Sequence, residues 1–183
     1  MRLRPMPPET RIETPRLVLR PMTAADIDDL VTEIDDFAVS GMLARVPYPY
    51  RRADALAFLD QAAENAGGGL ALAIAHTGRG IGGIGLTGIL AQCEVGYWRG
   101  RRHWGEGYAT EAAEAFLGYA FGPLGLYVIR SGVFVDNPKS LRVQEKLGFE
   151  RVGSHPVHCL ARGMKVAHID TVLTRERFLE RRR

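Results

Sequence analysis

Disulfide chemistry has almost no basis in this sequence, because its 183 residues include only two cysteines. Cys93 and Cys159 form no CxxC motif and no plausible disulfide framework. Such sparse use of cysteine is typical of a reducing compartment, so we expect a cytoplasmic protein. A signal peptide and an apolar run of about 18 residues are also lacking, and we therefore expect no membrane partner.

A strong charge of one sign is lacking as well. Lys and Arg total 24 and Asp and Glu total 21, which leaves a net charge of only +3. The basic residues form no dominant block, so the composition gives little support to a nucleic-acid partner. Hydrophobic residues make up 46% of the chain, enough for a substantial core, and we expect one domain over residues 1–183.

The strongest pattern that is present is a strand, a glycine turn and a helix between residues 94 and 121. From residue 107 on, apolar residues recur at the spacing of one helix face: Ala109, Ala112, Ala113, Phe116, Leu117, Ala120 and Phe121. The preceding turn contains Gly105 and Gly107 and leaves several N–H groups free at the helix start. Because the helix dipole favours an anion there, the turn predicts a phosphate site.

Strand and helix patterns flank this unit on both sides. Strands are predicted at residues 16–21, 70–75, 81–90, 91–98 and 127–135, and a strand pair at 151–174 around a loop at 154–164. Helices are predicted at 23–31 and 55–63 and after Asn137, which caps a helix that begins at Pro138 and ends before Gly148. Residues 1–15 form an irregular lead-in, and residues 175–183 a charged, solvated tail. A strand, a helix and a strand in succession imply a right-handed parallel crossover, hence a mixed α/β fold.

Three further features have two interpretations each. The glycines between residues 80 and 88 suggest a dinucleotide cradle, but they fit a bulged strand better because no helix pattern follows. Residues 34–52 mix aromatic and basic residues and favour an ordinary connection, with the lining of a binding cleft as the alternative. His155, His158 and Cys159 make a metal site conceivable, although further ligands at fitting spacing are missing.

Two blocks of sequence and the opening TPRLVLRP (residues 14–21) resemble a known family. The first block is EVGYW with HWGEGYATEA (residues 94–98 and 103–112), and the second is VDNPKSLRVQEKLGF (residues 135–149). They resemble the GNAT acyltransferase superfamily, above all its Rim-type branch of N-terminal acetyltransferases of ribosomal proteins. The family's turn pattern, Gln/Arg-x-x-Gly-x-Gly/Ala, falls on Trp104, Gly107 and Ala109. Trp104 departs from it, but this turn binds pyrophosphate through backbone N–H groups, so binding should persist.

The resemblance implies both a fold and a coenzyme. The implied fold is a mostly antiparallel central sheet flanked by helices, with one parallel strand pair splayed around acetyl-coenzyme A. No metal is required. The residues implied to bind the coenzyme are Tyr97, Trp98, Arg99, Trp104, Gly105, Glu106, Gly107, Tyr108, Ala109, Thr110, Asn137 and Arg142. Arg99, Arg101, Arg102 and Arg142 are cations that could favour its phosphates or could simply be solvated.

The resemblance also implies two catalytic residues. Glu94 corresponds to a base that acts through water, and Ser140 to a serine beside the thioester sulfur. Many superfamily members have a catalytic tyrosine where this chain has Gln144, so a tyrosine acid at that position is excluded. We expect Glu94 and Ser140 to meet across two adjacent parallel strands. The alternatives are an arginine partner for Glu94, a plain cap for Asn137 and a surface role for Ser140.

The implied function is transfer of an acetyl group from acetyl-coenzyme A to a primary amine by direct attack on the thioester. The amine would belong to a protein or peptide N-terminus or to a small molecule, and self-association as a homodimer is left open. We expect acceptor specificity to lie in residues 34–52 and 154–164. The competing hypotheses are a non-catalytic, acyl-coenzyme A-binding regulatory module and a different nucleotide-binding protein.

Overall fold

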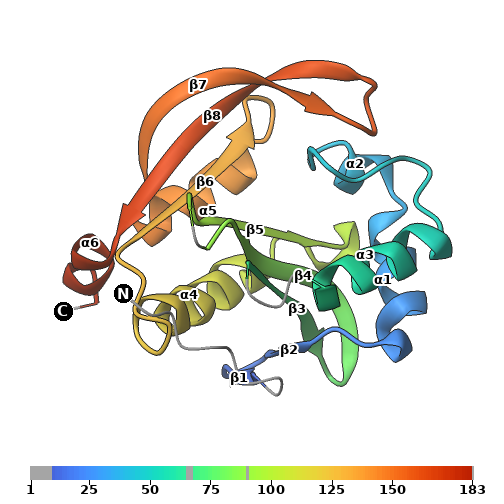
Figure 1. Cartoon of the computed structure of the whole chain (residues 1–183), viewed down its shortest axis with the longest axis horizontal. Coiled ribbons are helices and arrows are strands. Elements are labelled where there is room, and N and C mark those ends of the chain that lie inside the picture. The colour runs from blue at the N-terminus through green and yellow to red at the C-terminus, as the bar shows by residue number, and fades with distance from the viewer. Residues whose placement is uncertain (1–9, 65–67, 90, 183) are drawn as a thin grey trace.

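The computed structural model describes residues 10–64, 68–89 and 91–182, which fold around one eight-stranded sheet (Figure 1). The strand order is β1-β2-β3-β4-β5-β6-β8-β7. The strands are β1 (Ile12–Glu13), β2 (Val18–Pro21), β3 (Gly69–His76), β4 (Arg79–Thr87), β5 (Glu94–Arg99), β6 (Val128–Phe134), β7 (Glu150–Cys159) and β8 (Met164–Thr174). Only β5 and β6 pair in parallel among the described strands, which confirms the predicted mixed, mostly antiparallel sheet.

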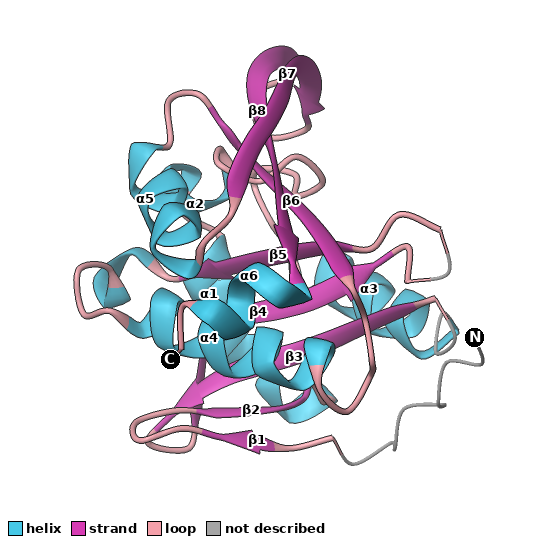
Figure 2. Cartoon of the chain, turned by 90° about the vertical axis from the view of Figure 1, so that its left-hand side faces the viewer, coloured by secondary structure: helices cyan, strands magenta, loops and turns pink. Residues whose placement is uncertain are grey.

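Helices cover both faces of the sheet (Figure 2). They are α1 (Ile27–Ile34), α2 (Phe37–Ser40), α3 (Arg52–Glu64), α4 (Tyr108–Phe121), α5 (Pro138–Leu147) and α6 (Arg175–Glu180), with short 3₁₀ turns at Ala24–Asp26 and Arg101–His103. The predicted apolar stripe of α4 is buried against the main core, in which Phe116 and Leu117 are fully enclosed. A second, smaller core around Ile27 and Ile34 lies between α1 and α3 and takes in Trp98.

Four glycines of the 80–88 cluster, at positions 80, 82, 83 and 85, belong to β4, as the strand interpretation predicts, and Gly88 follows directly after the strand. They allow neighbouring strands to approach closely, because a Cβ at Gly85 would run into the carbonyl oxygen of Leu70. The predicted irregularity lies in the same hairpin, where the register of β3 with β4 shifts between Ile74 and Ala75. This glycine cluster is therefore strand, and it precedes no helix.

The parallel pair β5–β6 opens almost as soon as it forms. The described residues pair at one position only, Glu94 with Arg130, where the Arg130 N–H donates to the Cys93 carbonyl oxygen at 2.8 Å. One residue further along, the Ser131 hydroxyl donates to the Val95 carbonyl oxygen at 2.9 Å and takes the place of a ladder bond. Beyond that point β5 continues to Arg99 paired with β4 on its other edge and no longer with β6, so the predicted splay is present.

Gln144 holds the strands at this opening. Its side-chain amide donates to the Ser131 hydroxyl at 2.9 Å and to the Gly132 carbonyl at 3.3 Å, while its oxygen accepts from the Thr171 hydroxyl at 2.8 Å. Gln144 is 1% exposed, and every polar atom of its side chain is therefore satisfied inside the protein. Gln144 stands where the resemblance would place a tyrosine, and its side chain links α5 to β6 and β8 by hydrogen bonds.

Two sequence predictions about the C-terminal part are wrong in detail. The loop expected at residues 154–164 is mostly strand, because β7 runs to Cys159 and β8 starts at Met164. The tail expected to be solvated does form the helix α6, but Phe178 is 1% exposed and stacks on Phe121 with ring centres 5.2 Å apart. Burial of this aromatic ring ties the end of the chain to the main core.

The predicted lead-in also needs correction. Ile12–Glu13 forms β1, which pairs with Val18 and Leu19 of β2, so the ordered sheet begins before residue 16. Residues 1–9 of the predicted lead-in, residues 65–67 at the predicted helix end, residue 90 of the predicted strand and residue 183 of the predicted tail lie outside the described residues.

The long β7–β8 hairpin arches over the sheet and meets the segment after α2 (Figure 1). At its tip the Leu160 N–H donates to the Ala44 carbonyl at 3.0 Å, and Arg162 Nε donates to the Gly41 carbonyl at 2.6 Å. Cys159 is fully buried there, with its sulfur 3.5 Å from the Leu43 carbonyl oxygen. The two segments expected to carry acceptor specificity therefore touch each other.

A prediction concerns Asp26, a buried carboxylate that accepts from Arg20 at 2.8 and 2.6 Å and from Thr23 N–H and hydroxyl at 2.9 Å. Burial alone would raise the pKa of Asp26, but these bonds outweigh it and hold the pKa below its ordinary value. Asp26→Asn should lose roughly 1–3 kcal/mol of unfolding free energy at pH 7.

Urea unfolding across pH measures this effect. A carboxylate with a lowered folded-state pKa stabilises above its unfolded pKa, and that stability is lost as pH falls through the folded value. The difference between wild type and Asp26→Asn should thus shrink toward pH 3, whereas exposed Asp60→Asn should change little at any pH. A difference independent of pH would contradict the stabilising role of the charge.

Candidate functional site

The glycine turn before α4 has the geometry of an anion site. Gly105 and Gly107 have φ of 88° and 79°, a region that favours glycine, and Gly107 is the N-cap of α4. Residues 105–107 are exposed. Since α4 is 14 residues long, its free N–H groups and dipole make this end favourable for a phosphate.

Arg16 stabilises this turn. The sequence analysis missed this role because it assigned residue 16 only to a strand. Its guanidinium donates to the Glu106 carbonyl at 3.0 Å, lies 4.6 Å from the centre of the Tyr108 ring and pairs with Glu111 at 2.6 Å. Burial would raise the pKa of Glu111, but bonds from Thr14 and Arg16 outweigh it and hold the pKa low. The first turn of α4 is thereby fixed against the N-terminal segment.

Trp104 connects the end of β5 with this turn. Its indole N–H donates to the Arg99 carbonyl at 3.0 Å, and its ring lies 5.2 Å from the ammonium of Lys139 on α5. Arg99 donates back to the His103 carbonyl at 3.3 Å, and burial lowers the pKa of its guanidinium. Trp104, the residue that departs from the turn pattern, therefore ties the loop before α4 back to the end of β5.

The remaining residues that were predicted to bind the coenzyme differ in how far they are exposed. Ala109 is buried in the core and Thr110 is half-buried in the first turn of α4, while Arg142 is exposed on α5. Arg102 forms an ion pair with buried Glu33 of α1. Arg102 is therefore paired with a carboxylate of α1, and the structure gives no support to a role for it in binding phosphate.

Tyr97 and Ser140 bring two hydroxyl groups together beside the opened strand pair. The Tyr97 oxygen lies 3.1 Å from the Ser140 hydroxyl and 3.3 Å from the Ser140 carbonyl oxygen. Asn137 caps α5 by accepting the Ser140 N–H at 3.1 Å, as predicted, and so fixes the serine in the first turn. Burial raises the pKa of Tyr97 to about 12, so its phenol keeps its proton at neutral pH.

Glu94 lies on the other side of β5 from this hydroxyl pair. Side chains alternate along the strand, and Val95 and Tyr97 join the main core while Trp98 joins the second core between α1 and α3. Glu94 shares the face of Trp98 and is exposed. The expectation that Glu94 and Ser140 meet is therefore wrong, because the strand itself separates their side chains.

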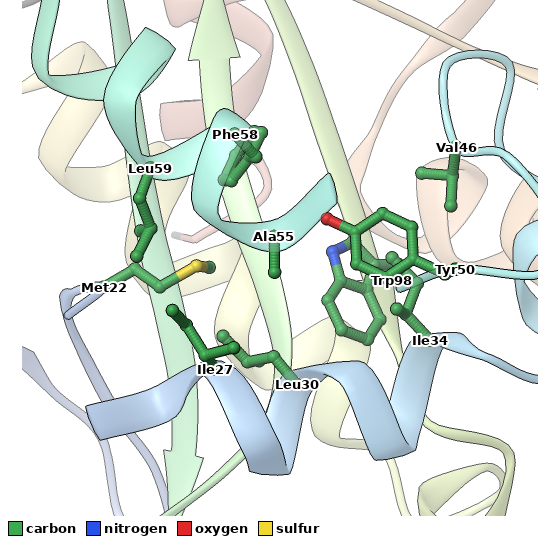
Figure 3. A pocket seen from close by; sticks show the side chains of 10 residues that line it. All are labelled: Met22, Ile27, Leu30, Ile34, Val46, Tyr50, Ala55, Phe58, Leu59 and Trp98. Atoms are coloured by element: carbon green, nitrogen blue, oxygen red, sulfur yellow. The ribbon is translucent and has the colours of Figure 1, made fainter. Parts of the chain in front are cut away.

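The Trp98 face contains an apolar cavity of about 70 Å³ between α1, α3 and β5 (Figure 3). Trp98, Tyr50, Ile34 and Phe58 line it, and Tyr50 comes from the segment expected to carry acceptor specificity. Burial raises the pKa of Tyr50 to about 12. The cavity can take a small apolar group but offers no cation or anion site of its own.

The metal site considered for His155, His158 and Cys159 is not present. Cys159 is buried against backbone carbonyls, and His158, three residues from His155 on β7 and opposite Lys165, points to the other face of the hairpin. His155 instead meets His168 and Asp170, whose ligand atoms all lie within 4.8 Å of one another. His168 and Asp170 stand two positions apart in the second strand of the predicted pair, and this spacing was the available sequence signal for the cluster.

Comparisons with known proteins agree with this geometry. Residues 16–150 match the model of the acetyltransferase (GNAT) domain family. An uncharacterized N-acetyltransferase, p20, of Bacillus licheniformis is 30% identical over 146 residues, which cover 76% of this chain and 82% of that protein. In the part of the chain that the structure describes, no helix is long and apolar enough to cross a membrane.

Two solved structures share the fold at low identity. Mycobacterium smegmatis RimJ in complex with CoA-disulfide has a TM-score of 0.80 at 19% identity, over 92% of this chain and 87% of that one. Spermidine N-acetyltransferase from Vibrio cholerae, in complex with CoA and spermine, has a TM-score of 0.78 at 19% identity, over 91% and 99%. At this identity they support the fold, and the first fits the Rim-type resemblance.

A prediction tests the glycine turn. Acetyl-coenzyme A at ~100 times its dissociation constant should add roughly 2.7 kcal/mol to the unfolding free energy of the wild type. Gly107→Val should lose most of this gain, because a β-branched residue resists a φ of 79° and moves the N–H groups. Gly107→Ala is a milder variant in case valine prevents folding.

Gly125→Val is the matched control, because Gly125 has a φ of 68° and open space around it but lies beyond the far end of α4. It should lose intrinsic stability and keep the full ligand-induced shift in melting temperature. Equal shifts in the Gly107 variants and the wild type would remove the turn from the binding site.

Proposed function

The chain belongs to the GNAT acetyltransferase family, and from this premise we propose that it transfers an acetyl group from acetyl-coenzyme A to a primary amine. The observation that carries the proposal is the opening of β5 from β6 next to a helix N-terminus that suits a phosphate. One feature provides a slot between strands, and the other provides N–H groups for a pyrophosphate.

The proposed coenzyme position follows these two features. The pyrophosphate would lie on the N–H groups of residues 104–110, with Arg16 as an added cation behind the turn. The pantetheine arm would run along the backbone of Tyr97, Trp98 and Arg99, whose β6 side carries no ladder bond in the described residues. Asn137 would flank the arm, although its side-chain oxygen already caps α5. The CoA bound to both solved neighbours supports coenzyme A as co-substrate.

The proposed reaction passes through the opening between β5 and β6. The amine reaches the thioester from the Glu94 face, loses a proton to Glu94 directly or through water, and attacks the carbonyl carbon. Backbone N–H groups at the opened edge of β5 stabilise the oxyanion. The thiolate leaves on the opposite side of the strand, where Ser140 and Tyr97 can donate a proton.

The acceptor is proposed as a class rather than a compound. The solved neighbours include RimJ and a spermidine N-acetyltransferase, so peptide N-termini and polyamines are the first acceptors to test. Thiol release from acetyl-coenzyme A over a panel of such amines measures turnover. Binding of acetyl-coenzyme A without thiol release would favour the non-catalytic module, and binding of ATP or NAD instead would favour the nucleotide-binding alternative.

A second prediction concerns Glu94. An exposed carboxylate such as that of Glu94 can accept the amine proton. Glu94→Gln should lower kcat/KM by ~10²–10⁴-fold, the usual contribution of a positioned base, and leave acetyl-coenzyme A binding intact. Exposed Glu180→Gln on α6 is the control and should behave as wild type. Unchanged kcat/KM in Glu94→Gln across the pH range would exclude it as the base.

A third prediction concerns the hydroxyl pair. Coenzyme A thiolate leaves tolerably well without help, so Ser140→Ala and Tyr97→Phe should each cost less than Glu94→Gln, about 10-fold in kcat/KM. Because the two oxygens are 3.1 Å apart, the double variant should lose less than the product of the single losses. A double-mutant cycle on kcat/KM provides the measurement, and multiplicative losses would mean that the two hydroxyls act independently.

A further inference from the structure

A histidine–carboxylate–histidine cluster lies on the β7–β8 hairpin. His168 Nδ1 is 3.0 Å from one oxygen of Asp170, and His155 Nδ1 is 2.8 Å from the other. The two imidazole rings meet edge to face with centres 5.6 Å apart. Both Nδ1 atoms are thus engaged by one carboxylate, which leaves Nε2 as the free nitrogen of each ring.

Strand register places this cluster on the Glu94 face of the sheet. Thr171 and Ser131 point to the Gln144 side, so the alternate residues His168 and Asp170 point to the other side. Asp170 pairs with Gly132 of β6, and His168 with Phe134. The cluster therefore shares a face with Arg130, which pairs with Glu94.

His168 lies at the place where the two strands separate. Its imidazole rests directly on Gly132, since a Cβ there would lie 2.7 Å from His168 Nε2. Because Glu94 pairs in parallel with Arg130, Gly132 is the counterpart of Gly96 across the opening. A side chain at Gly96 would meet nothing within 4 Å. The space beside Gly96 on β5 is thus free, whereas the imidazole of His168 covers Gly132 on β6.

The surroundings of His168 hold its imidazole in one orientation. His168 has 16% of its side chain exposed, against 58% for His155 on the outer strand. Burial would raise the pKa of Asp170, but the bonds from His155 and His168 outweigh it and keep the carboxyl ionised. Charged groups on this face include Arg130, Glu94 and Arg162, whose guanidinium pairs with Asp136 at 2.6 Å and stacks on Phe134.

We propose that His168 is a second catalytic base of the acetyl transfer, with Asp170 as its positioning residue, and the inference rests on the proposed function. An ammonium loses two protons when it becomes an amide. Glu94 takes the first as the amine enters, and His168 Nε2 takes the second as the C–N bond forms. The C–S bond then breaks, the sulfur leaves with its electron pair and the hydroxyl pair protonates it.

The balance of this step is complete without a further reactant. The products are the amide, the free thiol of coenzyme A and one proton released to solvent. The proton on His168 returns through solvent to the hydroxyl pair. Asp170 stays ionised throughout and holds the tautomer in which Nε2 is the basic nitrogen.

The pH dependence of kcat/KM separates the two bases. A histidine acts as a base only while its imidazole is neutral, so kcat/KM should fall toward acidic pH with an inflection as the imidazole is protonated, whereas a carboxylate base loses its function only at lower pH. His168→Gln should lower kcat/KM at pH 8 by ~10²–10⁴-fold and remove that inflection. Glu94→Gln should keep the inflection at a lower rate. Asp170→Asn should lower kcat and shift the inflection, because the tautomer is no longer fixed.

The controls use the remaining histidines of the hairpin. His155→Gln should cost less than 10-fold and keep the inflection, because Asp170 still holds His168. His158→Gln, on the other face of β7, should match the wild type. Melting shifts with acetyl-coenzyme A should be equal in all these variants, which checks that they fold and bind.

The outcomes distinguish the inference from the proposed function. Wild-type thiol release with an unchanged rate and inflection in His168→Gln would overturn the inference alone. Absence of thiol release by the wild type with every amine would overturn the proposed function and the inference with it. Loss of activity on EDTA treatment with recovery by zinc would show that the cluster holds a metal, and would overturn the assignment of His168 as a base.

Discussion

The separation of β5 from β6 is the constraint on which the rest of the site depends. Two strands inside a sheet normally satisfy their backbone groups on each other, so opening them leaves donors and acceptors without partners. Here Ser131 takes over the Val95 carbonyl, Gln144 holds Ser131, and Thr171 holds Gln144. The side chains of Ser131, Gln144 and Thr171 thus replace backbone hydrogen bonds between the strands, and they stabilise the opening.

The opening gives the site two chemically different sides. The α4 and α5 side contains the glycine turn, Trp104 and the hydroxyl pair of Tyr97 and Ser140. The other side contains Glu94, the small apolar cavity beside Trp98 and the cluster around Asp170. A thioester held between the strands would present its sulfur to donors on one side and its carbonyl carbon to proton acceptors on the other. This division is the reason for proposing the acid and the base on separate faces of one strand.

The acceptor side is bounded by two segments that are distant in sequence. The tip of the β7–β8 hairpin bonds to the Gly41–Ala44 stretch through Leu160 and Arg162. Their contact encloses the face on which Glu94 and His168 lie, so changes in either segment would alter what can approach both groups. In the proposed reaction the coenzyme would be held largely by backbone groups, whereas side chains of these two segments would contact the acceptor.

The sequence by itself determined the local elements. The stripe of α4, the Asn137 cap, the Gly148 stop and the glycine-rich β4 follow from periodicity and turn chemistry among neighbouring residues. The parallel crossover also followed, because a strand, a helix and a strand have essentially one way to pack. These signals covered the glycine turn, so the phosphate side of the site could be proposed from the sequence.

Only the tertiary structure decided which side chains meet. Tyr97 reaches Ser140 across 43 positions, Arg16 reaches Glu111 across 95, and β7 extends to Cys159 through part of the predicted loop. Glu94 points away from Ser140, and His168 points toward the opening. Both directions depend on the register of strands that come from different parts of the chain. A shift of one residue in register turns a side chain to the opposite face, and no local pattern fixes that register.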